Sequence, residues 1–281
     1  MPGWTEALPE FDLPAAQHLV EELPSPAPGV VEAVCLSAPS GRFVVLSSRA
    51  PLVTAYETTL FDLLAESRYP APRPKRSRGD SLLSRVSDGA VVSCYPRPPG
   101  EPAQAASLSQ LLEVGRLVAR LHQLGETHPA KVSGCTDPQA LLARIPQGPL
   151  RDRLARALDE PLPPLPSGAL HGGFGPSRAL FMGERCSAVL PSGAACFGAF
   201  LLDIADAAVQ FLSGATQPLA TIHTLLAGYQ RSRKLLPEEG RALPQTLRLA
   251  AAREAARRNC ATPLETLQGF SDADLRGLAA S

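Results

Sequence analysis

Residues 96–100, with the sequence PRPPG, divide the chain into two parts of different character. Proline fixes φ and has no backbone N–H, so a segment with three prolines can continue neither a helix nor a strand. Before this segment, short β-branched and apolar runs predict strands, and after it apolar residues recur at helical spacing. We therefore expect an α+β protein with a β-rich N-terminal lobe over residues 1–97 and a mainly helical C-terminal lobe over residues 98–281.

The same patterns predict the individual elements. In the first part we expect a hairpin and two further strands, at Val30–Leu36, Arg42–Ser47, Leu82–Val86 and Gly89–Tyr95, with one helix at Thr54–Ser67. In the second part we expect helices at Ser109–Leu124, Leu141–Leu158, Leu202–Leu212, Leu219–Leu235 and Leu243–Cys260, and strands at Ala179–Met182 and Ser187–Leu190.

The charge balance excludes broad classes of partner. Lys+Arg and Asp+Glu both number 27, so no global field favours nucleic acid or an anionic membrane. A basic cluster at residues 73–78 lies among prolines and is interpreted as a solvated loop. No apolar run approaches the roughly 18 residues that a membrane helix needs, and the N-terminus lacks a signal-peptide pattern. We expect no nucleic-acid partner and no membrane association.

The cysteines predict thiols rather than a metal site. None of the six forms a CxxC pair, and none has a neighbouring histidine. We expect them to be reduced, as in a cytoplasmic protein, and we expect no metal and no cofactor.

Several motifs, in a fixed order, carry a resemblance to a known family. They are Trp4-Thr5-Glu6, GRFVV at 41–45, YPAPRP at 69–74, GRLVARLH at 115–122, AGYQ at 227–230, Leu243-Pro244, and the arginines at 248, 253 and 258. Together with the stretch LHGGFGPSRALF at 170–181, they resemble the homoserine kinase branch of the aminoglycoside phosphotransferase (choline kinase-like) superfamily. The resemblance implies a two-lobed kinase-like fold, with a remnant catalytic loop at residues 171–181. The family activity is ATP-dependent phosphorylation of homoserine, a step of threonine biosynthesis.

The chemistry of that family depends on three residues that this chain lacks. The family's catalytic Asp, which orients the substrate hydroxyl and accepts its proton, corresponds to Gly173. Its two magnesium-binding positions, an Asn and an Asp, correspond to Arg178 and Pro191. Loss of a general base costs about 10²–10⁴ in rate, and magnesium requires oxygen ligands that neither replacement supplies. The resemblance therefore indicates that the family's catalytic residues are absent.

Other family positions are retained. His171 opens the loop, and Asp203 matches a helix Asp that ties down the backbone of the catalytic loop. We interpret these two residues and His122 as buried, hydrogen-bonded scaffold groups. Arg49 and Arg178 are the candidates for residual contact with a nucleotide phosphate.

Three hypotheses follow. The first is a catalytically inactive homoserine kinase-like pseudokinase that binds an unknown protein partner or small ligand in a scaffolding or regulatory role. The alternative is an active phosphotransferase that uses ATP and magnesium through relocated ligands, drawn from Glu184, Asp203 and Asp206. The alternative requires at least two of these carboxylates to converge near the loop. A third reading keeps the cleft for different chemistry, such as nucleotidyl transfer, with no residue that specifically supports it.

Overall fold

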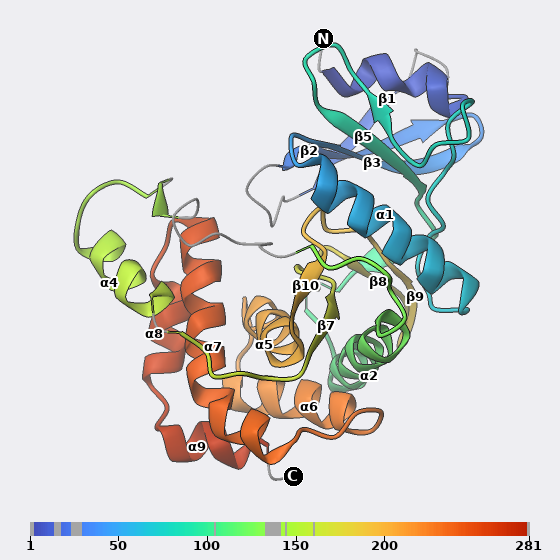
Figure 1. Ribbon diagram of the computed structural model, residues 1–281. Helices are drawn as coiled ribbons and strands as arrows, with labels where there is room; N and C mark the ends of the chain where they lie inside the picture. Colours follow the sequence, from blue (N-terminus) through green and yellow to red (C-terminus); the bar gives the residue numbers. More distant parts are fainter. Residues whose placement is uncertain are drawn as a thin grey trace.

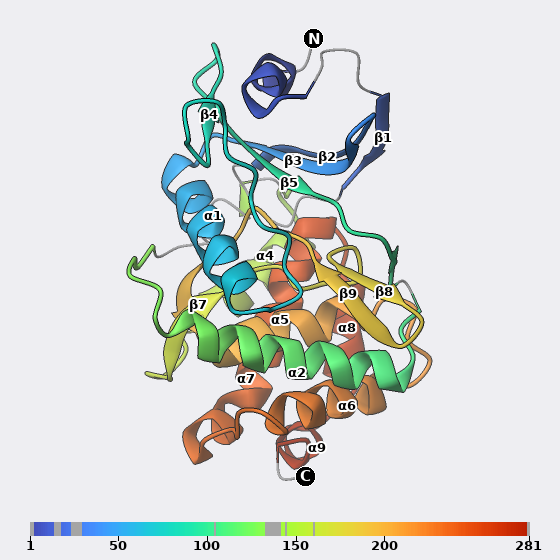
Figure 2. The ribbon, with the colours of Figure 1, turned by 90° about the vertical axis from the view of Figure 1, so that its right-hand side faces the viewer.

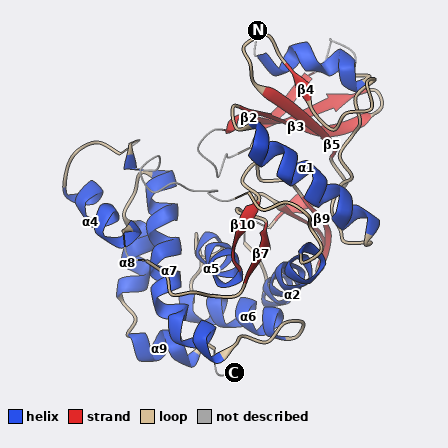
Figure 3. Ribbon diagram, in the orientation of Figure 1, coloured by secondary structure: helices blue, strands red, loops and turns tan. Residues whose placement is uncertain are grey.

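The computed structural model describes residues 3–279, except 14–17, 24–29, 104, 133–141, 144 and 160. The chain forms two lobes, with the N-terminus in the upper lobe and the C-terminus at the base of the lower one (Figure 1). Strands dominate the upper lobe and helices the lower one (Figure 3). The α+β, two-lobed kinase-like architecture is thus confirmed, while the exact boundary at residue 97 stays a prediction.

The N-lobe is built on one antiparallel sheet with the strand order β1-β2-β3-β5-β4. The strands are β1 (His18–Glu22), β2 (Val30–Ala38), β3 (Gly41–Ser48), β4 (Ser84–Arg85) and β5 (Val91–Pro96). The 3-10 helix η1 (Gly3–Phe11) packs on one face through Trp4, Leu8 and Phe11, and α1 (Pro51–Glu66) lies between the sheet and the lower lobe (Figure 1). The expected hairpin is confirmed, but the strand expected at 82–86 is only two residues long.

The C-lobe is mainly helical. Its helices are α2 (Leu108–Gly125), α4 (Pro149–Leu158), α5 (Phe200–Gln210), α6 (Pro218–Gln230), α7 (Pro237–Arg258), α8 (Thr262–Gln268) and α9 (Asp272–Gly277). Its strands are β6 (Glu101–Pro102), β7 (Ser167–Leu170), β8 (Ala179–Met182), β9 (Arg185–Val189) and β10 (Cys196–Ala199), arranged as the sheets β6-β8-β9 and β7-β10.

Prolines move several helix boundaries from the expected positions. Of the helix expected over 141–158, α4 accounts for Pro149–Leu158 and follows Gly148 with φ 150, while residues 141 and 144 lie outside the described residues. The helix expected over 243–260 begins six residues earlier, at Pro237, because proline is favoured in the first turn. The helix expected to reach residue 235 ends at Gln230.

Close helix packing fixes the lower lobe. Helices α2 and α6 cross at Gly115 and Gly228, where a Cβ would collide with the carbonyl oxygens of Leu225 and Leu112 on the other helix. This contact holds α2 and α6 side by side at the base of the molecule (Figure 2). None of the described helices is long and apolar enough to cross a membrane.

Two local expectations need correction. The basic segment is not simply solvated: Arg73 pairs with Asp62 at 2.9 Å and Arg78 with Asp12 at 2.8 Å, which fastens it to α1 and to the end of η1. Cys35, Cys94, Cys186 and Cys260 are free thiols as expected. Cys196 is disulfide-bonded, and Cys135 lies outside the described residues.

Candidate functional site

The loop at 171–178 follows β7 and is enclosed by protein. Residues 171–175 are all buried, and Phe174 packs against His171 with 5.0 Å between ring centroids. Gly172 adopts φ +74, and a Cβ there would collide with the carbonyl oxygen of Ala194. A glycine is therefore required at this bend for both conformation and space.

The Asp203 carboxylate fixes the backbone of this loop. It lies in the first turn of α5 and is 1% exposed. Oδ2 accepts a hydrogen bond from the backbone N–H of His171 at 2.9 Å, and Oδ1 accepts one from Gly172 at 2.9 Å. His122 Nε2 lies 3.1 Å from Oδ2. Asp203 and His122 thus occupy the positions of scaffold groups, as interpreted from the sequence.

A buried chain of hydrogen bonds extends from Asp203 through the lower lobe. His122 Nδ1 lies 2.9 Å from the Tyr229 hydroxyl, which accepts a hydrogen bond from Arg233 at 3.1 Å. Arg233 in turn pairs with the buried Glu239 at 3.0 Å. Since Arg233 only donates, Tyr229 donates to Nδ1 of a neutral His122, whose Nε2–H then faces Asp203. The chain links α7, α6, α2 and α5 to the loop.

Burial and hydrogen bonds determine the charges of these groups. Burial would raise the pKa of the Asp203 carboxyl, but the hydrogen bonds from His122 and the loop backbone hold that pKa below its ordinary value. Burial lowers the pKa of His122 below its ordinary value and that of His171 to about 4. The loop is therefore held by an ionised aspartate and two neutral histidines at neutral pH.

His171 reaches the other side of the loop. Its Nε2 donates to the carbonyl oxygen of Leu190 at 2.9 Å, and its own carbonyl accepts the Ser192 hydroxyl at 2.7 Å. Pro191 lies between these two partners. His171 thus joins the loop to the segment that contains Pro191.

Glu57 of α1 contacts that same segment, which the sequence analysis missed. It is fully buried and accepts hydrogen bonds from the backbone N–H groups of Ser192 at 2.9 Å and Gly193 at 2.8 Å. Its position three residues before Leu60 and seven before Leu64 places a carboxylate on the apolar face of the helix. That signal was readable in the sequence, because a charge on a buried face is rarely left without a partner.

Arg178 lies in the same interior. It is 1% exposed, although it is among the largest side chains of the protein. Burial raises the pKa of the Glu57 carboxyl, while the hydrogen bonds from Gly193 and Ser192 and the positive charge of Arg178 act in the opposite direction. The charge of Arg178 also contributes to the lowered pKa of His171. A buried cation thus stands at the position that the resemblance assigns to a metal-binding amide.

The residues present do not fit a magnesium ion. Gly173 and Pro191 carry no oxygen ligand in their side chains, and the Arg178 guanidinium repels a cation. Among the described residues, no group of three or more His, Cys, Asp or Glu side chains could hold a metal.

The three carboxylates proposed as relocated ligands are each engaged with other groups, although Asp203 contributes to the raised pKa of its neighbour Asp206. Glu184 lies at the tip of the β8–β9 hairpin and accepts the Ser107 hydroxyl at 2.6 Å. Asp206 pairs with Arg253 at 3.2 Å, and Asp203 binds the loop backbone. Each carboxylate therefore has a different set of partners.

The ion pair that Arg49 forms lies in the N-lobe and does not involve the 171–178 loop. The Arg49 side chain is 61% exposed and pairs with Asp88 in the β4–β5 turn at 3.1 Å. Arg178 is enclosed, so contact with a phosphate would require it to leave the interior. The role of both as phosphate contacts stays a prediction.

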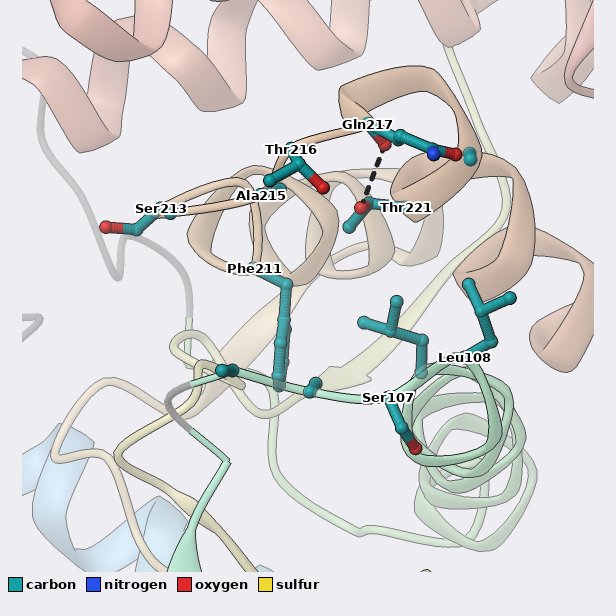
Figure 4. Close-up of a pocket in the computed structure, with 13 residues that line it drawn as sticks. Ser107, Leu108, Phe211, Ser213, Ala215, Thr216, Gln217 and Thr221 are labelled. Atoms are coloured by element: carbon teal, nitrogen blue, oxygen red, sulfur yellow. Dashed lines mark hydrogen bonds between the residues drawn. The ribbon is translucent and has the colours of Figure 1, made fainter.

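A cavity of about 460 Å³ lies elsewhere in the lower lobe, between the start of α2 and the α5–α6 connection (Figure 4). Its lining includes Leu108, Phe211 and Thr221, and the Thr221 hydroxyl donates to the carbonyl oxygen of Gln217 at 3.1 Å. No lining side chain is ionisable, so this cavity supplies no acid or base.

Comparison with known sequences shows that the chain is similar to several homoserine kinases. No model of a known protein family matches the chain. Homoserine kinase of Caulobacter sp. strain K31 is 29% identical over 237 residues, which are 78% of this chain and 74% of that protein. Homoserine kinase of Beijerinckia indica is 30% identical over 218 residues, 71% of this chain and 66% of the relative. This chain belongs to the homoserine kinase branch of the aminoglycoside phosphotransferase-like superfamily.

Solved structures agree with this branch at the level of the fold. The microcompartment-associated aminopropanol kinase superposes with a TM-score of 0.65 at 17% identity, covering 98% of this chain and 92% of that chain. An aminoglycoside phosphotransferase from Alicyclobacillus acidocaldarius gives 0.61 at 14% identity, covering 93% and 91%. These likenesses agree with a two-lobed kinase-like fold for this chain.

Proposed function

We propose that this protein is a catalytically inactive member of the homoserine kinase branch, a pseudokinase that acts through binding, scaffolding or regulation. A phosphotransferase-like origin follows from its relatives, and the inactivity is our inference. The observation that carries it is the buried Arg178. In place of an oxygen ligand and a magnesium ion, the interior holds a guanidinium whose charge acts on Glu57.

The retained contacts fit this proposal. Asp203, His122 and His171 hold the loop in shape, while Gly173 has no side chain to orient a hydroxyl. Phosphoryl transfer depends on positioning and on charge neutralisation by bound metal, and among the described residues no group of three or more His, Cys, Asp or Glu side chains could hold that metal. The protein partner or small ligand, and a cytoplasmic location, are parts of the same proposal.

The test is calorimetric titration of ATP into the purified protein, with and without magnesium and homoserine, together with an assay for ADP release. We expect no magnesium-dependent binding and no turnover. Tight binding that requires magnesium, or turnover that is lost on changing a residue of the 171–178 loop, would overturn the proposal in favour of an active enzyme.

A matched variant sharpens this test. The triple substitution G173D/R178N/P191D returns the three family residues to their positions. If those residues alone account for the inactivity, the triple variant gains magnesium-dependent heat on ATP titration that the parent chain lacks. Circular dichroism and a thermal melt establish that it is folded before the titration is interpreted.

A further inference from the structure

A second cavity, of about 560 Å³, lies on the side of the molecule formed by α2, the segment after α1 and the β8–β9 hairpin. Figure 2 turns this side toward the viewer. We call it the arginine groove; it is lined by Arg68, Pro70, Glu113, Arg116, Arg120, Met182, Arg185, Cys186 and Ser187. Its volume is in the range of sites that hold small organic ligands, about 300–1,000 Å³.

The positive charge of the groove is concentrated and only partly compensated. Four arginines and one glutamate line it, in a chain whose formal net charge is zero. Arg116 is paired with Glu113 through two hydrogen bonds of 2.7 and 2.8 Å. Within the part of the chain that the structure describes, no carboxylate lies within ion-pair distance of Arg68, Arg120 or Arg185. The groove therefore has three positive charges without an acidic partner.

These charges come from three separate elements that face one another. Arg116 and Arg120 lie one turn apart on the same side of α2, Arg68 follows α1, and Arg185 opens β9. Arg120 is held in place because it donates to the backbone carbonyl of Ser67 at 3.1 Å. Burial raises the pKa of the Cys186 thiol to about 12, so this sulfur stays neutral and does not offset the arginines.

We propose that the arginine groove binds a compact anion with two or more phosphate groups. Guanidinium groups match phosphate oxygens with paired N–H donors, and converging arginines favour clustered negative charge over a single carboxylate. The exposed Met182, at 60%, and Pro70 provide apolar surface for an organic group attached to the phosphates. This site shares no lining residue with the 171–178 loop, so it goes beyond the proposed function and does not depend on it.

The experiment is calorimetric titration of pyrophosphate, ADP and citrate into the full chain without magnesium, at low and high salt. Pyrophosphate tests the phosphates alone, ADP adds an organic group, and citrate offers similar charge as carboxylates. We expect saturable binding of pyrophosphate and ADP that weakens with salt, and weaker binding of citrate. Absence of saturable binding of both phosphate ligands, or citrate binding as tight as pyrophosphate, would overturn the proposal.

Substitutions locate the site. R68Q/R185Q removes two exposed arginines of the groove and should weaken binding about tenfold or more, since two charge-assisted contacts are lost. R241Q removes an exposed arginine of α7 and should leave binding unchanged. Equal binding by R68Q/R185Q and R241Q would place the ligand outside the groove and refute the assignment. If ATP also binds the parent chain without magnesium, the same pair tests whether ATP binds in this groove.

Discussion

At the scale of single residues, Glu57 and Arg178 are buried side chains of opposite charge that influence each other in the interior of the protein. Glu57 accepts hydrogen bonds from the backbone N–H groups that follow Pro191. A buried carboxylate without partners costs several kcal/mol, so these donors and the nearby guanidinium make its burial possible. The buried charges of Glu57 and Arg178 in this sense compensate each other within the structure.

The contacts of Glu57 give a direct prediction of stability. E57A leaves the buried N–H groups of Ser192 and Gly193 without their acceptor and removes a negative charge that interacts with Arg178, and should lower the free energy of unfolding by about 3–5 kcal/mol in urea. E57Q keeps one oxygen that can accept from Ser192 and Gly193, so it should lose less than half as much. E66A, at an exposed glutamate of the same helix, should change stability by no more than about 1 kcal/mol. A loss in E57A no larger than in E66A would contradict the role given to Glu57.

At the scale of elements, the remnant loop is held between α5, α2 and the segment after β9. Asp203 binds its backbone from α5, His122 buttresses Asp203 from α2, and His171 reaches the Leu190 carbonyl. Burial and hydrogen bonds keep Asp203 ionised and keep His122 and His171 neutral at neutral pH. The shape of the loop should therefore depend on pH through its histidines.

We predict that stability falls as the pH drops from about 6.5 to 4. The folded-state pKa of His171 is lowered to about 4 and that of His122 is also lowered, so in this window the unfolded chain binds protons that the folded chain does not. The raised pKa of Glu57 has the opposite effect on stability, because the folded chain then binds a proton that the unfolded chain does not. A comparison of the parent chain with H171Q, which keeps Glu57, isolates the contribution of His171. Relative to H171Q, the parent chain should lose up to about 1.4 kcal/mol more per pH unit.

The measurement is urea unfolding of the parent, H171Q and H223Q between pH 7.5 and 4.5. Gln can replace the Nε2 donor of His171 to Leu190 but does not titrate. His223 is exposed on α6, so H223Q should follow the parent chain. Parallel curves for the parent chain and H171Q would show that His171 does not carry this dependence.

The elements also show which structural features a sequence can predict. The hairpin of β2 and β3 and the helix α2 were expected nearly to the residue, because alternation and a clear apolar stripe are local signals. The short strands β6, β7 and β10 were missed, since their pairing partners lie far along the chain. The positions of His171, His122 and Asp203 were predicted through the family motifs. Glu57 was missed because its partners are backbone groups 135 residues away.

At the scale of the whole molecule, a cluster of apolar side chains joins the two lobes. Val44, Leu46 and Tyr95 come from the upper sheet and Phe61 from α1, while Leu180 and Leu190 come from the lower lobe. All six are at most 1% exposed. Together with the Glu57 contacts, this cluster makes the lobes a single packed unit rather than two bodies joined by a hinge.

This packing predicts one cooperative thermal transition for the whole chain. Chains of this length often unfold through intermediates. A single transition therefore requires contacts that couple the two lobes, such as those of Leu190. L190A should cost about 2–5 kcal/mol and lower the melting temperature by about 5–10 °C, because it opens a cavity between the lobes. L52A, at a leucine that is 74% exposed, should melt like the parent chain.

Differential scanning calorimetry tests the cooperativity through the ratio of calorimetric to van't Hoff enthalpy. A ratio near one for the parent chain, and two resolved transitions for E57A/L190A, are expected if Glu57 and the cluster couple the lobes. Two transitions already in the parent chain would mean that the lobes unfold independently.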